Sequence, residues 1–195
     1  LNKIFLLIRS KNNISSKKRF EKICNNIFLK DKIAPYLDMI YIIDGSLDYE
    51  NFGVDKSILE KMDINIIVNN AASVKFNDKM IIAYNNNCKT VVNLANCAKL
   101  YFKNMKKIIH VSTFYVDFPK EIEYIFPENY NTIINDINNG MNLDEINKKH
   151  NFEFANSYVI TKLLAEKILE SYENNFKIHI VRPSIIANSY KFPIE

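Results

Sequence analysis

A tyrosine and a lysine four positions apart are the residues of this sequence best suited to catalysis. Tyr158 and Lys162 lie in the segment Asn156-Ser-Tyr-Val-Ile-Thr-Lys162, and on a helix this spacing places both side chains on one face. A free tyrosine has a pKa of about 10, so it needs a nearby cation before it can exchange protons near neutral pH. The ammonium group of Lys162 could provide that charge.

The Tyr-x-x-x-Lys spacing is weak evidence by itself. With 11 tyrosines and 23 lysines in 195 residues, about one such pair is expected by chance. An ordinary surface tyrosine at the start of a helix is the alternative. The residues elsewhere in the chain must therefore decide.

Two hydroxyl groups follow a predicted strand. Ser112 and Thr113 come directly after the apolar run Ile108-Ile-His-Val111, and open α/β sheets bind ligands at the carboxyl ends of their strands. A hydroxyl there can donate a hydrogen bond to a substrate carbonyl and stabilise the charge that develops on its oxygen. The alternative is a Ser-Thr turn that satisfies the local backbone, and the two residues are separate candidates.

Small residues follow another predicted strand, in the segment Asn69-Asn-Ala-Ala-Ser73. Side chains this short would let the backbone approach a flat cofactor closely. The alternative is a tight turn without a ligand.

An alternation of strands and helices must position these candidates. The predicted strands are 3–8, 39–43, 64–68, 107–111 and 177–181, and helix candidates lie near 16–29, 55–62, 79–102 and 158–173. This order predicts one α/β domain over residues 1–195 with a doubly wound parallel sheet of the Rossmann type. In the last helix we expect a buried stripe of Leu164, Ala165, Ile168, Leu169 and Tyr172, with Glu166, Lys167, Glu170 and Glu173 facing water.

Two parts of the chain depart from the alternation. Residues 117–157 carry prolines, a glycine and only a weak helical pattern at 141–149, so we expect an insertion over the sheet's edge beside the active site. The three glycines of the chain, Gly45, Gly53 and Gly140, lie too far apart to form a G-x-G-x-x-G turn. We therefore expect a fragment that lacks the first strand and the glycine-rich loop. In the strand order 3-2-1-4-5-6, that absence leaves two sheet edges unpaired.

Charge, cysteines and hydropathy exclude several functions. The net charge of +4 is spread among carboxylates, which favours a solvated surface over a nucleic-acid partner. Three scattered cysteines and three separated histidines, His110, His150 and His179, give no metal-ligand spacing. No apolar run reaches the roughly 18 residues of a membrane span.

The motifs together resemble the extended branch of the short-chain dehydrogenase/reductase superfamily, and most closely its male-sterility, or fatty acyl-CoA reductase, family. The resemblance covers nearly the whole chain. The matching segments are 3–9, 68–76, 110–116, 121–127, 156–169 and 180–186.

This resemblance implies roles for individual residues. Tyr158 would donate the proton, Lys162 would hold the nicotinamide ribose and lower the tyrosine's pKa, and Thr113 would bind the substrate oxygen. Asn86 would brace the active site. The cofactor would contact Asn70, Ala71 and Ala72 of the small-residue turn, Pro183 and Ser184 after the last strand, and Ser46 and Leu47, where the family usually has an Asp-Leu pair near the adenine.

The end of the first predicted strand indicates which dinucleotide binds. Arg9 stands where an NAD-specific protein commonly has a carboxylate for the ribose 2′-hydroxyl, and an arginine suits a 2′-phosphate instead. Lys11 could share this role. We therefore predict NADPH, the alternative being that Arg9 is a solvent-exposed cation at a strand end.

The resemblance implies NADPH-dependent reduction of a fatty acyl-CoA thioester to an aldehyde and then an alcohol. It also implies an intracellular protein, on the cytosolic face of endoplasmic reticulum or peroxisomal membranes, attached through regions outside this segment. Two alternatives stay open. One is an extended-type enzyme acting on a nucleotide sugar or another carbonyl, and the other is a dinucleotide-binding protein without turnover.

Overall fold

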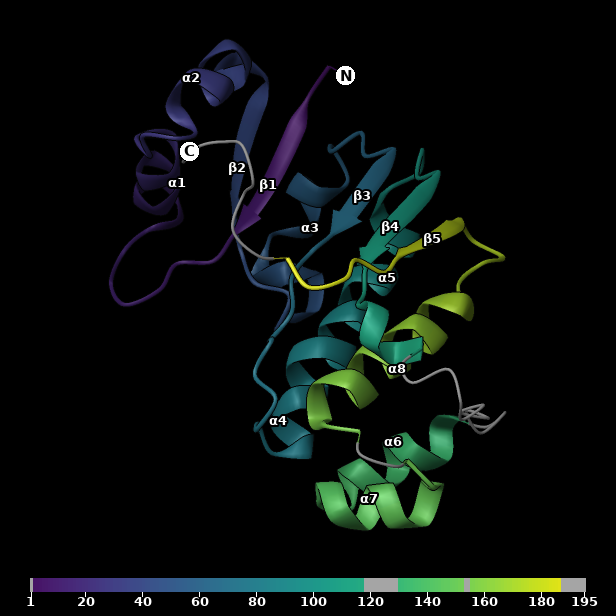
Figure 1. The fold of residues 1–195 in the computed structure, drawn as a ribbon. Helices are drawn as coiled ribbons and strands as arrows, with labels where there is room; N and C mark the ends of the chain where they lie inside the picture. The colour runs from purple at the N-terminus through teal and green to yellow at the C-terminus, as the bar shows by residue number, and fades with distance from the viewer. Residues whose placement is uncertain (1, 118–129, 153–154, 187–195) are drawn as a thin grey trace.

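Five parallel strands form the framework of the computed structural model, which describes residues 2–117, 130–152 and 155–186 (Figure 1). The strands are β1 (Ile4–Ile8), β2 (Ile40–Asp44), β3 (Ile66–Asn69), β4 (Lys107–Val111) and β5 (Lys177–Val181). Each strand begins and ends within two residues of its predicted bounds, so the strand predictions are confirmed.

The strands pair in two groups. β1 pairs with β2, while β4 lies between β3 and β5, and every pair is parallel. Within the described residues, one edge of β1 and one edge of β3 are therefore unpaired. The arrows of β1 and β3 point the same way in Figure 1. These edges are the ones that the strand order 3-2-1-4-5-6 leaves open when its first strand is absent.

Helices connect the strands. They are α1 (Ser16–Cys24), α2 (Lys30–Ile33), α3 (Lys56–Leu59), α4 (Met80–Tyr84), α5 (Thr90–Tyr101), α6 (Tyr130–Asn138), α7 (Leu143–His150) and α8 (Ser157–Glu170). Short 3-10 turns occur at Ala34–Met39 (η1), Glu50–Gly53 (η2) and Phe114–Asp117 (η4). Between α4 and α5 runs a π-helical turn, η3 (Asn85–Lys89), so the helix expected near 79–102 is one run with a widened middle.

The first helix is shorter than the expected 16–29. It begins at the cap residue Ser15, whose side chain accepts a hydrogen bond from Lys18 N, and ends at Cys24. The Asn26 side chain accepts from Phe28 N at 3.0 Å. Such a local bond competes with the helical hydrogen bonds, which explains the early end.

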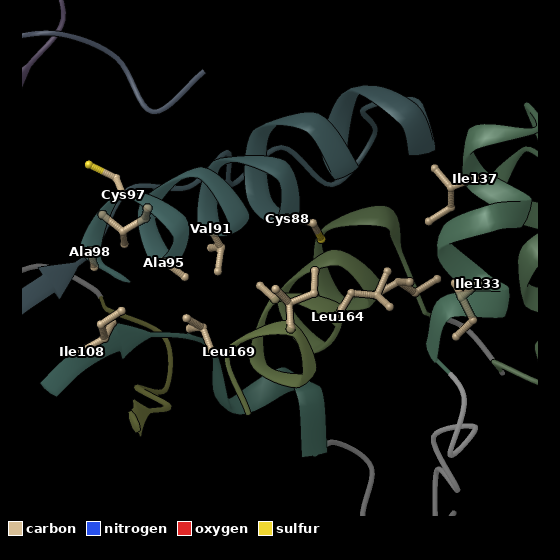
Figure 2. Close-up of a cluster of buried hydrophobic side chains, with 14 of the residues drawn as sticks. Cys88, Val91, Ala95, Cys97, Ala98, Ile108, Ile133, Ile137, Leu164 and Leu169 are labelled. Carbon is tan, nitrogen blue, oxygen red and sulfur yellow. The ribbon is translucent and has the colours of Figure 1, made fainter. Parts of the chain in front are cut away.

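The core forms where α5 and α8 pack together over β4. Figure 2 shows side chains of these three elements meeting, among them Val91, Ile108 and Leu164, all fully buried. The predicted stripe of the last helix is buried as expected, except that Tyr172 is half-buried. This packing fixes the rotation of the helix that carries Tyr158 and Lys162.

The outward face predicted for α8 is wrong at one position. Glu166 is 1% exposed, because Arg182, just after β5, binds both of its carboxylate oxygens at 3.1 and 2.6 Å. A paired carboxylate can be buried where an unpaired one cannot. Glu170 and Glu173 are exposed and Lys167 partly so, as predicted.

The described part of the insertion 117–157 is helical. The weak pattern near 141–149 corresponds to α7, which begins with a capping box between Asn142 and Glu145. The preceding helix α6 was not predicted. Its Ile133 and Ile137 join the core cluster (Figure 2), and α6 packs against α4 and α7.

Within the described ranges, no helix is both long enough and apolar enough to cross a membrane.

Candidate active site

The carboxyl ends of β3, β4 and β5 bring the candidate residues together. The parallel register aligns Asn69 with His110 and His110 with Ile180. After β4, Ser112 N donates to Val181 O at 2.7 Å and Phe114 N donates to Pro183 O at 2.9 Å. The hydroxyl segment is thereby attached to the segment that follows β5.

Lys162 is buried against β4. Its side chain is 1% exposed, and its Nζ donates to Val111 O at 2.6 Å and lies 3.1 Å from His110 Nε2. Burial lowers the pKa of Lys162 to about 8, although Glu166 and Cys88 act in the opposite direction. A lysine with such a pKa changes its charge near physiological pH.

Tyr158 lies one helical turn before Lys162 and is half-buried. Its ring packs against Phe76, with 5.5 Å between the ring centroids. Among the described residues, no hydrogen bond joins Tyr158 to Lys162. The two residues lie on one helix, but the lysine nitrogen donates its hydrogen bond to Val111 O of β4.

Ser112 and Thr113 are both buried. The Thr113 oxygen accepts a hydrogen bond from Tyr115 N at 3.4 Å and can still donate its own proton. The Ser112 hydroxyl has no hydrogen-bond partner among the described residues. Because an unsatisfied buried hydroxyl is costly, a ligand oxygen at this strand end would stabilise the arrangement.

The small-residue turn after β3 is accessible. Asn70, Ala71 and Ala72 are exposed, while the buried Asn69 accepts from Ala71 N through its Oδ1 at 3.3 Å. The turn is therefore accessible to a ligand.

Asn87 holds this turn to the helix that carries Tyr158. Its Oδ1 accepts from Ser73 N at 2.7 Å, and its Nδ2 donates to Ser73 O and to Thr161 Oγ1. The sequence singled out Asn86, which is half-buried and whose backbone oxygen accepts from Thr90 Oγ1. Asn86 was implied by the family resemblance, and the contacts of Asn87 with Ser73 and Thr161 are not visible in the sequence.

The proposed adenine-side residues gather near the ends of β1 and β2. Arg9 forms an ion pair with Asp48 at 3.3 Å, and Ser46 Oγ donates to the same carboxylate oxygen at 2.7 Å. The backbone oxygen of Leu47 accepts from Asn93 at 2.7 Å. Lys11 is exposed in a short turn with Ile14. Asp48, the partner of Arg9, was not singled out in the sequence.

The remaining candidates follow β5. Pro183 is half-buried and Ser184 is exposed. Among the described residues, no group of three histidine, cysteine or acidic side chains could hold a metal ion.

A family model described as Male sterility protein matches residues 1–192 of the chain. The chain belongs to this NAD-binding family. The resemblance that the motifs indicated is therefore confirmed.

Curated relatives match the chain from end to end. Fatty acyl-CoA reductase wat of Drosophila melanogaster is 27% identical over 208 residues, covering 100% of this chain and 40% of the relative. Fatty acyl-CoA reductase 1 of Homo sapiens is 27% identical, covering 99% of this chain and 39% of the relative. The chain thus spans about two fifths of the length of these relatives.

Solved structures share the fold. A thiolation-reductase di-domain from an archaeal non-ribosomal peptide synthetase superposes with a TM-score of 0.64 at 23% identity, over 93% of this chain and 35% of that one. The UDP-Glc/GlcNAc 4-epimerase of Campylobacter jejuni gives a TM-score of 0.53 at 20% identity, over 92% and 45%. These likenesses confirm the Rossmann-type α/β fold.

Proposed function

We propose that the protein reduces fatty acyl-CoA thioesters with NADPH, first to the aldehyde and then to the alcohol. The observation that carries this proposal is the meeting of two buried hydroxyls, Ser112 and Thr113, with the helix of Tyr158 and Lys162 at the carboxyl end of β4. The names of the curated relatives supply the substrate class.

The described residues fit a dinucleotide. The exposed turn Asn70–Ala72 and the strand-end segments offer backbone to a flat ligand, the Ser112 hydroxyl lacks a partner among the described residues, and Arg9 offers a cation for a 2′-phosphate. When bound, NADPH supplies the hydride that reduces the carbonyl carbon.

The protein's own groups act on the carbonyl oxygen. Thr113 and Tyr158 would donate hydrogen bonds to it, which stabilises the negative charge that develops as the carbon is reduced. Expulsion of the CoA thiolate then gives the aldehyde. In the second reduction, Tyr158 would give its proton to the alkoxide to form the alcohol, helped by the charge of Lys162.

We also propose that residues 1–195 are part of a larger reductase domain with an active-site insertion at 117–157. The unpaired edges of β1 and β3 support one further parallel strand between them. The two-fifths coverage of the relatives agrees with this.

The function is tested by NADPH oxidation with the full-length protein. With a long-chain acyl-CoA we expect NADPH oxidation, followed by absorbance at 340 nm, and a fatty alcohol product, detected by gas chromatography. With UDP-glucose we expect neither. Oxidation with the sugar nucleotide alone would favour the nucleotide-sugar alternative. Tight NADPH binding without any turnover would favour a non-catalytic dinucleotide-binding protein.

Replacing Arg9 with alanine tests the choice of cofactor. We expect the KM for NADPH to rise about tenfold while the KM for NADH stays unchanged, because only NADPH carries the phosphate that the guanidinium would bind. Steady-state kinetics with both cofactors measure this. Lys17→Ala, which removes an exposed cation of α1, is the matched control. An equal change for both cofactors would assign Arg9 a role without phosphate recognition.

A further inference from the structure

A buried histidine contacts the lysine of the proposed active site. His110, on β4, is 1% exposed, and both of its ring nitrogens have a partner. Its Nδ1 lies 3.1 Å from Asn69 Nδ2, and its Nε2 lies 3.1 Å from Lys162 Nζ. The proposed function has given His110 no task.

The orientation of Asn69 determines which nitrogen of His110 carries the proton. Asn69 Oδ1 accepts from Ala71 N at 3.3 Å, so the amide NH₂ group faces the histidine. An NH₂ group can only donate, and His110 Nδ1 must therefore accept. In a neutral ring the proton then lies on Nε2.

The ring is neutral under ordinary conditions. Burial, and then the charge of Lys162, lower the pKa of His110 to about 3. In the structure its Nε2–H bond therefore points at Lys162 Nζ.

This arrangement requires an unprotonated lysine. Lys162 already donates to Val111 O, and to accept from Nε2–H it needs a lone pair, which an amine has and an ammonium lacks. The other charged or titratable groups that act on Lys162 are Glu166, paired with Arg182, and Cys88. Burial raises the pKa of the Cys88 thiol, so it stays uncharged.

We propose that His110 is a positioning residue, which holds Lys162 as a neutral amine against β4 until protonation releases the lysine toward Tyr158 and the cofactor ribose. The proton comes from solvent, and no covalent bond other than the new N–H changes. Once protonated, Lys162 and His110 Nε2–H are both donors and repel each other. The inference rests on the proposed function, since it assigns Lys162 its task there.

The activity test compares two variants of the full-length protein. His110→Phe keeps a ring but removes the donor, so neutral Lys162 loses a stabilising bond and its proton is held more tightly. The alkaline limb of the kcat/KM profile is expected to move up by about one pH unit. His110→Gln offers an amide NH₂ to Lys162 and is expected to return the limb to within about 0.3 unit of wild type. An active His110→Phe variant with an unmoved limb would overturn the inference.

A second measurement needs no turnover. In protein labelled with ¹⁵N-histidine, the His110 signal, identified by its absence in His110→Gln, is expected to show the neutral Nε2–H tautomer from pH 5 to 8. An Nδ1–H tautomer, or titration within that range, would overturn the inference even if the enzyme is active. Conversely, the expected tautomer in a protein that never oxidises NADPH with acyl-CoA would contradict the proposed function alone.

Discussion

Replacing Tyr158 with phenylalanine is expected to lower kcat/KM for acyl-CoA reduction about 10³-fold, because the hydroxyl is the proposed acid and hydrogen-bond donor to the substrate oxygen. Its hydroxyl makes no hydrogen bond to any other described residue, and the contact of its ring with Phe76 survives the change. The melting temperature should therefore stay within about 2 °C of the wild type. NADPH oxidation and differential scanning calorimetry on the full-length protein measure the two effects.

Tyr172→Phe is the matched control for this substitution. The residue follows α8, and its hydroxyl donates to Asn96 Oδ1 at 2.8 Å, so the variant removes an equivalent group away from the site. We expect it to keep wild-type kcat/KM. Undiminished activity of Tyr158→Phe would remove Tyr158 from catalysis.

The features that the sequence predicted are those that follow from local periodicity. The five strands appear as runs of β-branched residues, and the stripe of α8 through Leu164 recurs every three or four positions. A helix that packs on a sheet buries one stripe, whereas the strands of a parallel sheet are covered on both faces and read as continuous apolar runs. These patterns were sufficient to place Tyr158 and Lys162 on one helix and Ser112 and Thr113 at a strand end.

The features that the sequence could not predict depend on a partner far along the chain. The helical pattern predicts Glu166 on the exposed face, and its burial depends on the ion pair with Arg182, which follows β5. Lys162 was expected to reach toward Tyr158, and its bond to Val111 O depends on how α8 packs over β4. In α6, a composition rich in asparagine and isoleucine has low helix propensity, and tertiary burial of Ile133 and Ile137 overrides it.

Replacing Lys162 with methionine is expected to have two effects that separate chemistry from stability. Activity should fall about 10³-fold, since the cation that assists Tyr158 is lost. Stability should change in a pH-dependent way, because burial lowers the pKa of Lys162 to about 8 in the folded protein, below its ordinary value of 10.5. Methionine has a similar length and no charge to bury.

The sign of the pH effect follows from proton binding. Between about pH 8 and 10.5 the unfolded chain keeps the lysine proton that the native protein has lost, so the wild type gains free energy of unfolding as the pH rises through this window. Below pH 8 the lysine is protonated in both states, so this group no longer makes the stability of the wild type change with pH. The methionine variant has neither cost nor gain from this residue. The free energy of unfolding of the variant relative to wild type is therefore highest at pH 7 and falls by on the order of 2 kcal/mol by pH 10.

Urea unfolding of the full-length protein at pH 7 and pH 10 measures this difference. Other groups titrate in the same window, but they do so in both proteins and cancel in the comparison. Lys167→Met is the control on the same helix, since its side chain lies near the surface in an ion pair with Glu170, and its effect should vary far less between the two pH values. If the stability difference between wild type and Lys162→Met were the same at both, Lys162 would not be a desolvated charge. That result would contradict the burial of the Lys162 amine against His110 and Val111, and with it the proposal that protonation releases the lysine.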